Sequence, residues 1–375
     1  MYQSIHLTLN DRRRETLCRR LLSAMVVTLV ASLLAGCGAS TPSPTPTPPP
    51  LASELDFYDW AGYMPQSVLD AFTAEYGVKV NYVVYESQED AEANMRAGKV
   101  YDVVVMGIDF IPRLVADGLL AEIDRRNVPN LKNISANFRD LTYDPGNKYS
   151  VLYEWSTTGL VYRTDLIKEP ITRWTDLWNP RYAGKVGVWA IPRSMIGIAL
   201  KSLGYSINSE NPAELEAALK RLIQLKSNAF FLDLNLATSA PVLESGQAAL
   251  VYGWPYDIME ARKGNAPISY VLPEEGTLLW GDNLVIPANS PNKYTAELFV
   301  NFILRPDISA KIVNEIVTAT ANEAARPFID PQILNDPVIF PPDDALKNAE
   351  IILPLSPAGQ KLYDDIWERF MAAGQ

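Results

Sequence analysis

The chain has 375 residues and a formal net charge of −11, from 33 Lys and Arg residues against 44 Asp and Glu residues. This acidic balance opposes binding to nucleic acids and to anionic lipid surfaces, and it suits a cationic ligand. The only histidine, His6, and both cysteines, Cys18 and Cys37, fall within the first 37 residues. The rest of the chain therefore excludes His- or Cys-dependent nucleophiles, zinc sites built from His or Cys, and structural disulfides.

The N-terminus has the pattern of a secretion signal. A basic stretch at residues 12–20 precedes an apolar run at residues 21–34, which is too short to span a membrane. The run ends in Leu34-Ala35-Gly36-Cys37, a pattern that resembles a bacterial lipoprotein box. We expect residues 1–36 to be removed and Cys37 to carry a lipid that holds the exported chain at the outer face of the cytoplasmic membrane. An uncleaved anchor with an incidental cysteine is the alternative.

A proline-rich segment follows Cys37. Residues 38–50 are almost entirely Ser, Thr, Pro, Gly and Ala, a composition that cannot form a core and favours extended polyproline II. At about 3.1 Å per residue it would span roughly 40 Å. We expect residues 37–51 to act as a tether that holds a folded body away from the membrane; a disordered tail fits the same position.

The remaining chain alternates strand and helix patterns. Runs rich in apolar, β-branched and aromatic residues predict strands at residues 54–59, 78–84, 101–106, 185–190, 248–253, 268–272 and 283–287. Helical spacing and end signals predict helices between Pro65 and Gly77, at 90–97 and 110–116, from Asn211 onward, and at 296–303, 309–316 and 357–371. In the helix after Asn211, the apolar face is expected to be Leu215, Leu219, Leu222 and Ile223. Strands that alternate with helices predict parallel pairing in an α/β fold.

Aromatic residues gather beside the predicted strand ends. Trp60 and Tyr63 follow the first strand, Trp254 follows the strand at 248–253, and Trp280 and Asp282 precede the strand at 283–287. Ring faces attract ammonium groups by about 0.5–2 kcal/mol each when desolvated. A carboxylate adds a charge-assisted hydrogen bond. These residues can form a box for an organic cation, or each Trp can simply pack against a neighbouring helix.

The sequence also resembles the spermidine/putrescine-binding proteins of ABC importers. The blocks that carry the resemblance run in order along the chain: residues 56–65 (DFYDWAGYMP), 101–105 (YDVVV), 174–180 (WTDLWNP), 201–206 (KSLGYS), 280–289 (WGDNLVIPAN) and 301–307 (NFILRPD). The resemblance implies a type II periplasmic-binding fold with two lobes, each a mixed, mainly parallel sheet flanked by helices, and a two-strand hinge. It divides the chain into lobe 1 (52–157 and 280–326) and lobe 2 (158–279 and 327–375), with hinges near residues 155–159 and 277–282.

The resemblance implies a monomeric receptor that delivers a polyamine or other small cation to a permease and its ATPase, without catalysis, cofactor or metal. Its ligand positions match Trp60, Tyr63, Asp109, Trp254, Trp280 and Asp282, although Asp109 stands where the spermidine binder has a tyrosine. Other positions depart from the family pattern: Ala61 and Gly107 replace hydroxyl-bearing residues, Ile191 and Ser194 replace two acids, and Thr318 and Ile352 replace a tyrosine and a glutamine.

These departures predict a rebuilt site. A buried ammonium without a counter-charge is very costly, so spermidine is not expected in the usual pose. Asp109, Glu154 or Asp257 could supply a relocated charge, or each could be a solvated or helix-capping acid. A receptor for a different solute, a ligand sensor for a signalling partner, and an exported hydrolase using Glu274 and Glu275 are the other readings of the sequence.

Overall fold

The computed structural model describes residues 48–233, 236 and 238–373, so the predicted signal, Cys37 and most of the tether lie outside the described residues. The strands are β1 Glu54–Trp60, β2 Lys79–Tyr85, β3 Val103–Gly107, β4 Ser150–Arg163, β5 Val186–Val188, β6 Ala229–Phe231, β7 Leu250–Gly253, β8 Ile268–Val271, β9 Leu278–Val285, β10 Ala319–Thr320 and β11 Glu350–Ile351. The helices are α2 Gln66–Tyr76, α3 Gln88–Arg96, α4 Ile111–Ala116, α5 Pro192–Ser202, α6 Pro212–Leu225, α7 Ala240–Glu244, α8 Pro255–Lys263, α9 Lys293–Ile303, α10 Pro306–Ile316, α11 Pro331–Leu334 and α12 Pro357–Ala372.

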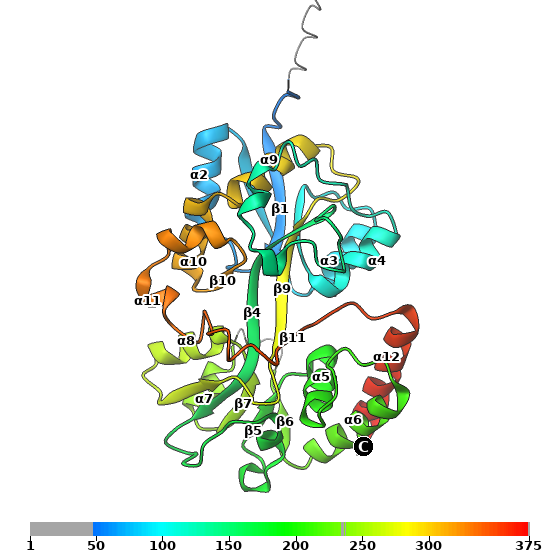
Figure 1. Cartoon of the computed structure of the whole chain (residues 1–375), viewed down its shortest axis with the longest axis vertical. Helices are drawn as coiled ribbons and strands as arrows, with labels where there is room; N and C mark the ends of the chain where they lie inside the picture. Colours follow the sequence, from blue (N-terminus) through cyan, green and yellow to red (C-terminus); the bar gives the residue numbers. More distant parts are fainter. Residues whose placement is uncertain (1–47, 234–235, 237, 374–375) are drawn as a thin grey trace, which may run out of the picture. The chain divides into compact units, whose positions relative to one another are not determined.

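The strands pair in the order β2-β1-β3-β9-β4-β7-β5-β6. The outer strands pair in parallel, β2 with β1 and β1 with β3 on one side, and β7 with β5 and β5 with β6 on the other. Every antiparallel pair involves β4 or β9, which run side by side (Figure 1). The predicted α/β fold with mixed, mainly parallel sheets is confirmed.

Two hydrophobic cores lie along these two long strands. Val151 and Leu152 of β4 and Leu284 of β9 belong to the first core, with β1, β3, α2 and α9. Leu160 of β4 and Leu278 of β9 belong to the second core, beside which α5, α6 and α12 pack together (Figure 1). The middle of each strand therefore passes from one core to the other, as the two-strand hinge predicts.

The C-terminal segment contributes to both cores. Val338 and Ile339, within the range predicted for lobe 2, pack in the first core. Tyr363, Ile366 and Phe370 of α12 pack in the second. The chain thus returns to the second core after Ile339.

Local sequence signals explain several element ends. Gly77 ends α2 with φ of 69°, a left-handed conformation that glycine adopts without strain, and its N–H donates to the Thr73 carbonyl at 2.9 Å. The Asn211 side chain accepts a hydrogen bond from the Ala213 N–H at 2.9 Å and so caps α6.

Two expectations need correction. β9 begins at Leu278 rather than at Asn283, so Trp280 and Asp282 lie within a strand and not in a preceding loop. Ile223 is 41% exposed, and the buried face of α6 is formed by Leu215, Ala218, Leu219, Leu222 and Leu225. At 3.6 residues per turn, position 223 lies at the edge of that face.

Among the described residues, no helix combines the length and the apolar character needed to cross a bilayer.

Candidate ligand-binding site

The middle of β9 carries an acid that faces two neighbouring strands. Asp282 lies opposite Gly107 of β3 and opposite Glu154 of β4. Because residues opposite each other in a sheet point to the same face, the side chains of Asp282 and Glu154 share one face. The register of β4 against β9 therefore places these two acids next to each other across the strand pair.

A third acid joins this face from β1. Phe57 pairs with Val103 of β3, and the alternation of side chains places Asp59 and Gly107 on the same face as that pair. Asp59 is fully buried, and its carboxylate accepts the Trp60 N–H at 2.7 Å while the Tyr82 hydroxyl lies 3.3 Å away. Burial, together with the nearby Asp282 charge, raises the Asp59 pKa well above its usual value despite these hydrogen bonds.

Asp282 is held by one side chain from α3. Gln88 Nε2 donates to Asp282 Oδ1 at 3.1 Å, and Gln88 Oε1 accepts the Gly107 N–H at 2.7 Å. A Cβ at position 107 would lie 2.8 Å from Gln88 Oε1, so the glycine makes room for this side chain. Burial raises the Asp282 pKa to about 7; the bond from Gln88 opposes the shift and the Asp109 charge adds to it.

Glu154 differs from the other two acids because, in the part of the chain that the structure describes, its side chain has no hydrogen-bond partner. It is 1% exposed, and neither of its carboxylate oxygens finds a donor among the described residues. Burial raises its pKa well above the usual value, and the charges of Asp59 and Asp282 raise it further. All the charges that shift it are negative.

Tyr63 lies near all three acids. Burial and the charges of Asp282, Glu154 and Asp59 raise the pKa of its hydroxyl, and Tyr256 of α8 is a further neighbour. The ring of Tyr63 lies 6.3 Å from the ring of Trp60. The loop after β1 therefore contributes an aromatic pair beside the acids, and α8 approaches the same place.

The other two tryptophans predicted to contact the ligand, Trp280 and Trp254, have different surroundings. Trp280 lies two residues before Asp282 in β9, so it shares the face of the acids, and its indole N–H is buried without a partner among the described residues. Trp254 precedes α8, with its ring 5.8 Å from Trp189 and 6.2 Å from Tyr252. Trp254 thus belongs to an aromatic group of the second core that reaches the site through α8.

The two other candidate acids have different surroundings. The charges of Arg193 and Arg113 lower the Asp109 pKa, although burial prevails and raises it overall. Asp257 accepts hydrogen bonds from Ser239 Oγ at 2.8 Å and from the Trp254 N–H at 2.7 Å. Asp257 therefore caps the start of α8, which is one of the two roles considered for it.

The start of α5 contributes no acidic residue to the site. Ile191 precedes this helix and Ser194 is buried in its first turn, and both are uncharged. The negative charge of the site therefore comes from β1, β4 and β9 and from Asp109 after β3, and not from α5.

Comparisons with known proteins agree with this architecture. Residues 67–341 match the model of the bacterial extracellular solute-binding proteins. The chain belongs to this family. The spermidine/putrescine-binding periplasmic protein of Escherichia coli is 34% identical over 322 residues, which cover 85% of this chain and 91% of that protein.

Solved structures of solute-binding proteins share the fold. The substrate-binding protein of a spermidine/putrescine ABC transporter from Streptococcus pneumoniae superposes with a TM-score of 0.77 at 28% identity, covering 85% of this chain and 99% of that one. A lipoprotein of Treponema pallidum gives a TM-score of 0.75 at 25% identity, and the match covers 84% of this chain and 99% of that one. The resemblance and the type II periplasmic-binding fold predicted from the sequence are confirmed.

The structure brings some of the predicted ligand residues of this solute-binding protein together. Trp60, Tyr63, Trp280 and Asp282 gather around the buried acids, Asp109 lies near Asp282, and Trp254 lies in the neighbouring aromatic group. Their contact with a ligand stays a prediction. Sequence analysis gave no role to Asp59 or Gln88, although an acid at the end of a buried strand is a signal that could have identified Asp59.

The raised pKa of Asp282 predicts a pH-dependent stability difference. Asp282 is 3% exposed and holds its proton up to about pH 7 in the folded protein, whereas an unfolded Asp releases it near pH 3.9. Its contribution to stability is present below the unfolded pKa and is lost as the pH rises toward 7. The substitution D282N removes this loss, so its stability relative to the wild type should rise by a few kcal/mol between about pH 4 and pH 7.

Urea unfolding of the ligand-free protein across this pH range measures the effect. D124N is a control, because bonds from Arg126 lower the Asp124 pKa and the same rise is not expected. If the unfolding free energies of D282N and the wild type change with pH in parallel, the raised pKa of Asp282 is contradicted.

Proposed function

We propose that this chain is the extracytoplasmic receptor of an ABC importer, which captures a polyamine or a related organic cation between two lobes and delivers it to a permease with its ATPase. The observation that carries the proposal is the group of buried carboxylates Asp59, Glu154 and Asp282, in which Glu154 has no hydrogen-bond partner among the described residues. A buried charge is costly unless it is paired, so this group calls for a cation from outside the chain.

The surroundings of the acids suit an amine. Trp60, Tyr63 and Trp280 lie beside the carboxylates, where ring faces can contact an ammonium group or the alkyl chain that carries it. Asp282, oriented by Gln88, offers a charge-assisted hydrogen bond. The relatives support the ligand class, since the Escherichia coli protein is named for spermidine and putrescine.

The long strands β4 and β9 would be the hinge. Tyr63 follows β1 and Tyr256 lies in α8, and Tyr256 is close enough to affect the pKa of the Tyr63 hydroxyl. A ligand bound there would contact both lobes, favour their closed arrangement and so be recognised by the permease. We propose that the receptor acts as a monomer, has no catalytic activity and is exported and anchored through a lipid on Cys37. The similar Treponema pallidum protein is itself a lipoprotein, which supports the anchor.

Titration calorimetry with putrescine, spermidine and related amines tests the ligand class. The wild type is expected to bind at least one of them, and D282N should weaken that binding by roughly 30-fold or more because a buried counter-charge is lost. D124N should bind as the wild type does, since Asp124 pairs with Arg126 at the surface. Tight binding that is unchanged in D282N would contradict the proposed site.

Cell fractionation tests the anchor. The wild type is expected in the membrane fraction, and C37S should move to the soluble exported fraction because it lacks the acylated thiol. The matched control C18S changes the only other cysteine, which lies within the predicted signal, and should stay with the membrane. Membrane retention of C37S would count against lipidation at Cys37.

A further inference from the structure

Glu154 stands apart from the other buried glutamate of the first lobe. Glu297 of α9 is also 1% exposed, but its carboxylate accepts hydrogen bonds from the Asp124 N–H at 2.8 Å and Asn127 Nδ2 at 2.7 Å, and it pairs with Lys293. Glu154 has none of these. A buried polar group without a partner costs about 1–3 kcal/mol, and more when it is charged. Packing alone would favour an apolar residue at this position.

The position of Glu154 ties it to the ligand site. It lies opposite Asp282 across the β4–β9 pair, next to a register shift between Leu152 and Glu154. It is also near enough to Tyr63 to raise the pKa of that hydroxyl. Glu154 is therefore a direct neighbour of a predicted ligand carboxylate and of a predicted ligand aromatic.

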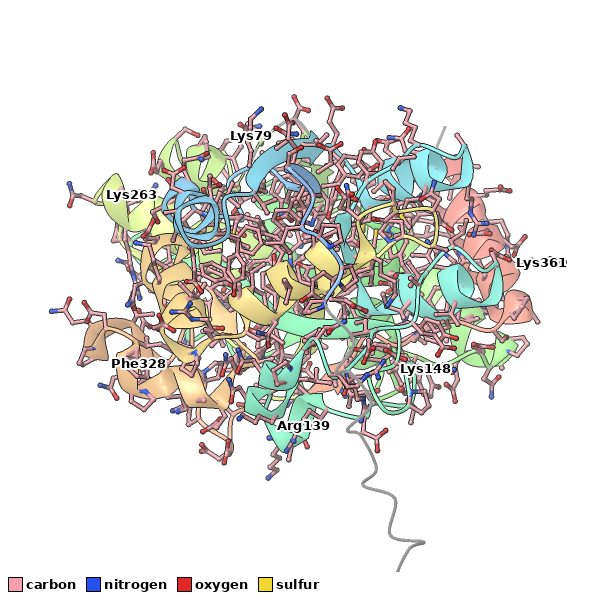
Figure 2. The ribbon with its side chains drawn as sticks, turned by 90° about the horizontal axis from the view of Figure 1, so that it is seen from above. Lys79, Arg139, Lys148, Lys263, Phe328 and Lys361 are labelled. Carbon is pink, nitrogen blue, oxygen red and sulfur yellow. The ribbon has the colours of Figure 1, made fainter. Side chains whose placement is uncertain are left out.

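The charged groups that act on Glu154 are all acidic. Asp59 and Asp282 are the two whose influence on it is resolved. Lysines of the chain such as Lys79, Lys148 and Lys263 are instead exposed and point outward (Figure 2). Within the described part of the chain, no side chain forms an ion pair with Glu154.

The other candidates for a relocated charge lie near positive charge or have hydrogen-bond partners. Asp109 experiences the charges of Arg193 and Arg113, and Asp257 caps α8. Of the three acids considered from the sequence, Glu154 has both carboxylate oxygens buried without a partner among the described residues.

We propose that Glu154 contacts the ligand and forms, with Asp282, a paired-carboxylate subsite for an organic cation whose two positive charges lie close together, such as a short diamine. This inference rests on the proposed function. Two adjacent carboxylates balance two nearby ammonium groups, whereas a single ammonium needs only one of them. A longer triamine would extend toward the start of α5, where Ile191 and Ser194 offer no charge. Glu154 would then set the preference for ligand charge and length.

A small cavity gives the competing explanation. It has a volume of about 10 Å³, and Glu154, Ser309, Thr318 and Thr320 are among the residues that line it. That volume is close to the lower limit for one water molecule. A water held there by Glu154 would make the residue structural, and the two roles differ in their effect on ligand preference.

The experiment compares putrescine with n-butylamine, a monoamine with the same chain length. Titration calorimetry of the wild type should give a clear preference for the diamine. In E154Q the affinity for putrescine should fall roughly 30-fold or more, while that for butylamine changes about threefold or less, because Asp282 remains and loses a like-charged neighbour. E154M, of similar size without the carboxylate, should show the same selective loss if E154Q does not fold.

A control variant and the possible outcomes distinguish the role of Glu154 from the proposed function. E297Q makes the same change at a buried glutamate that already has partners, and it should keep the preference for the diamine. If the wild type binds neither amine but binds spermidine or another amine of the panel, the short-diamine subsite is wrong while the proposed function stands; if it binds none of them, the proposed function fails. If it binds putrescine and E154Q keeps the same ratio of affinities, or loses both ligands equally, the role of Glu154 is wrong while the proposed function stands.

Discussion

Three carboxylates are buried together on one face of the sheet, where β4 and β9 pass between two hydrophobic cores. The cost of removing a charge from water is several kcal/mol, and like charges nearby add to it. Burial therefore favours the protonated form of these acids and raises the pKa of Asp282 to about 7. A ligand cation would offset the same electrostatic cost by supplying a positive charge.

The location of this constraint links binding to the fold. Both long strands leave the first core, carry Glu154 and Asp282 at the crossing, and continue into the second core. In the proposed function, a bound cation neutralises these acids within the two hinge strands themselves and not at the end of a loop. Tyr63, which lies near these acids, would then contact the same ligand.

Sequence reasoning predicted the parts of the fold that depend on local signals. β1, α2 and β2 follow from alternating apolar residues and from Gly77, whose left-handed conformation ends the helix. It placed the start of β9 five residues late because Trp-Gly-Asp reads as a loop, whereas pairing with both β3 and β4 makes it the centre of a strand. Tertiary pairing overrode a weak local propensity there.

The candidate site could be predicted only in part, for a related reason. The aromatic residues and Asp282 stand in long blocks that resemble a known family. Glu154 lies in an apolar run, and its nearness to Asp282 is set by the register of two strands more than a hundred residues apart in sequence. Sequence spacing carries no information about that register, so the sequence alone could not distinguish Glu154 from Asp109 and Asp257 as the relocated charge.

The account is tested most directly by counting the protons released when a ligand binds. Titration calorimetry with putrescine at about pH 7, in buffers of different ionisation enthalpy, gives this number. With Asp282 half-protonated in the ligand-free protein, the account predicts release of roughly half a proton or more per ligand, and a smaller release at higher pH. Binding with the same heat in every buffer, and hence no proton released, would contradict it.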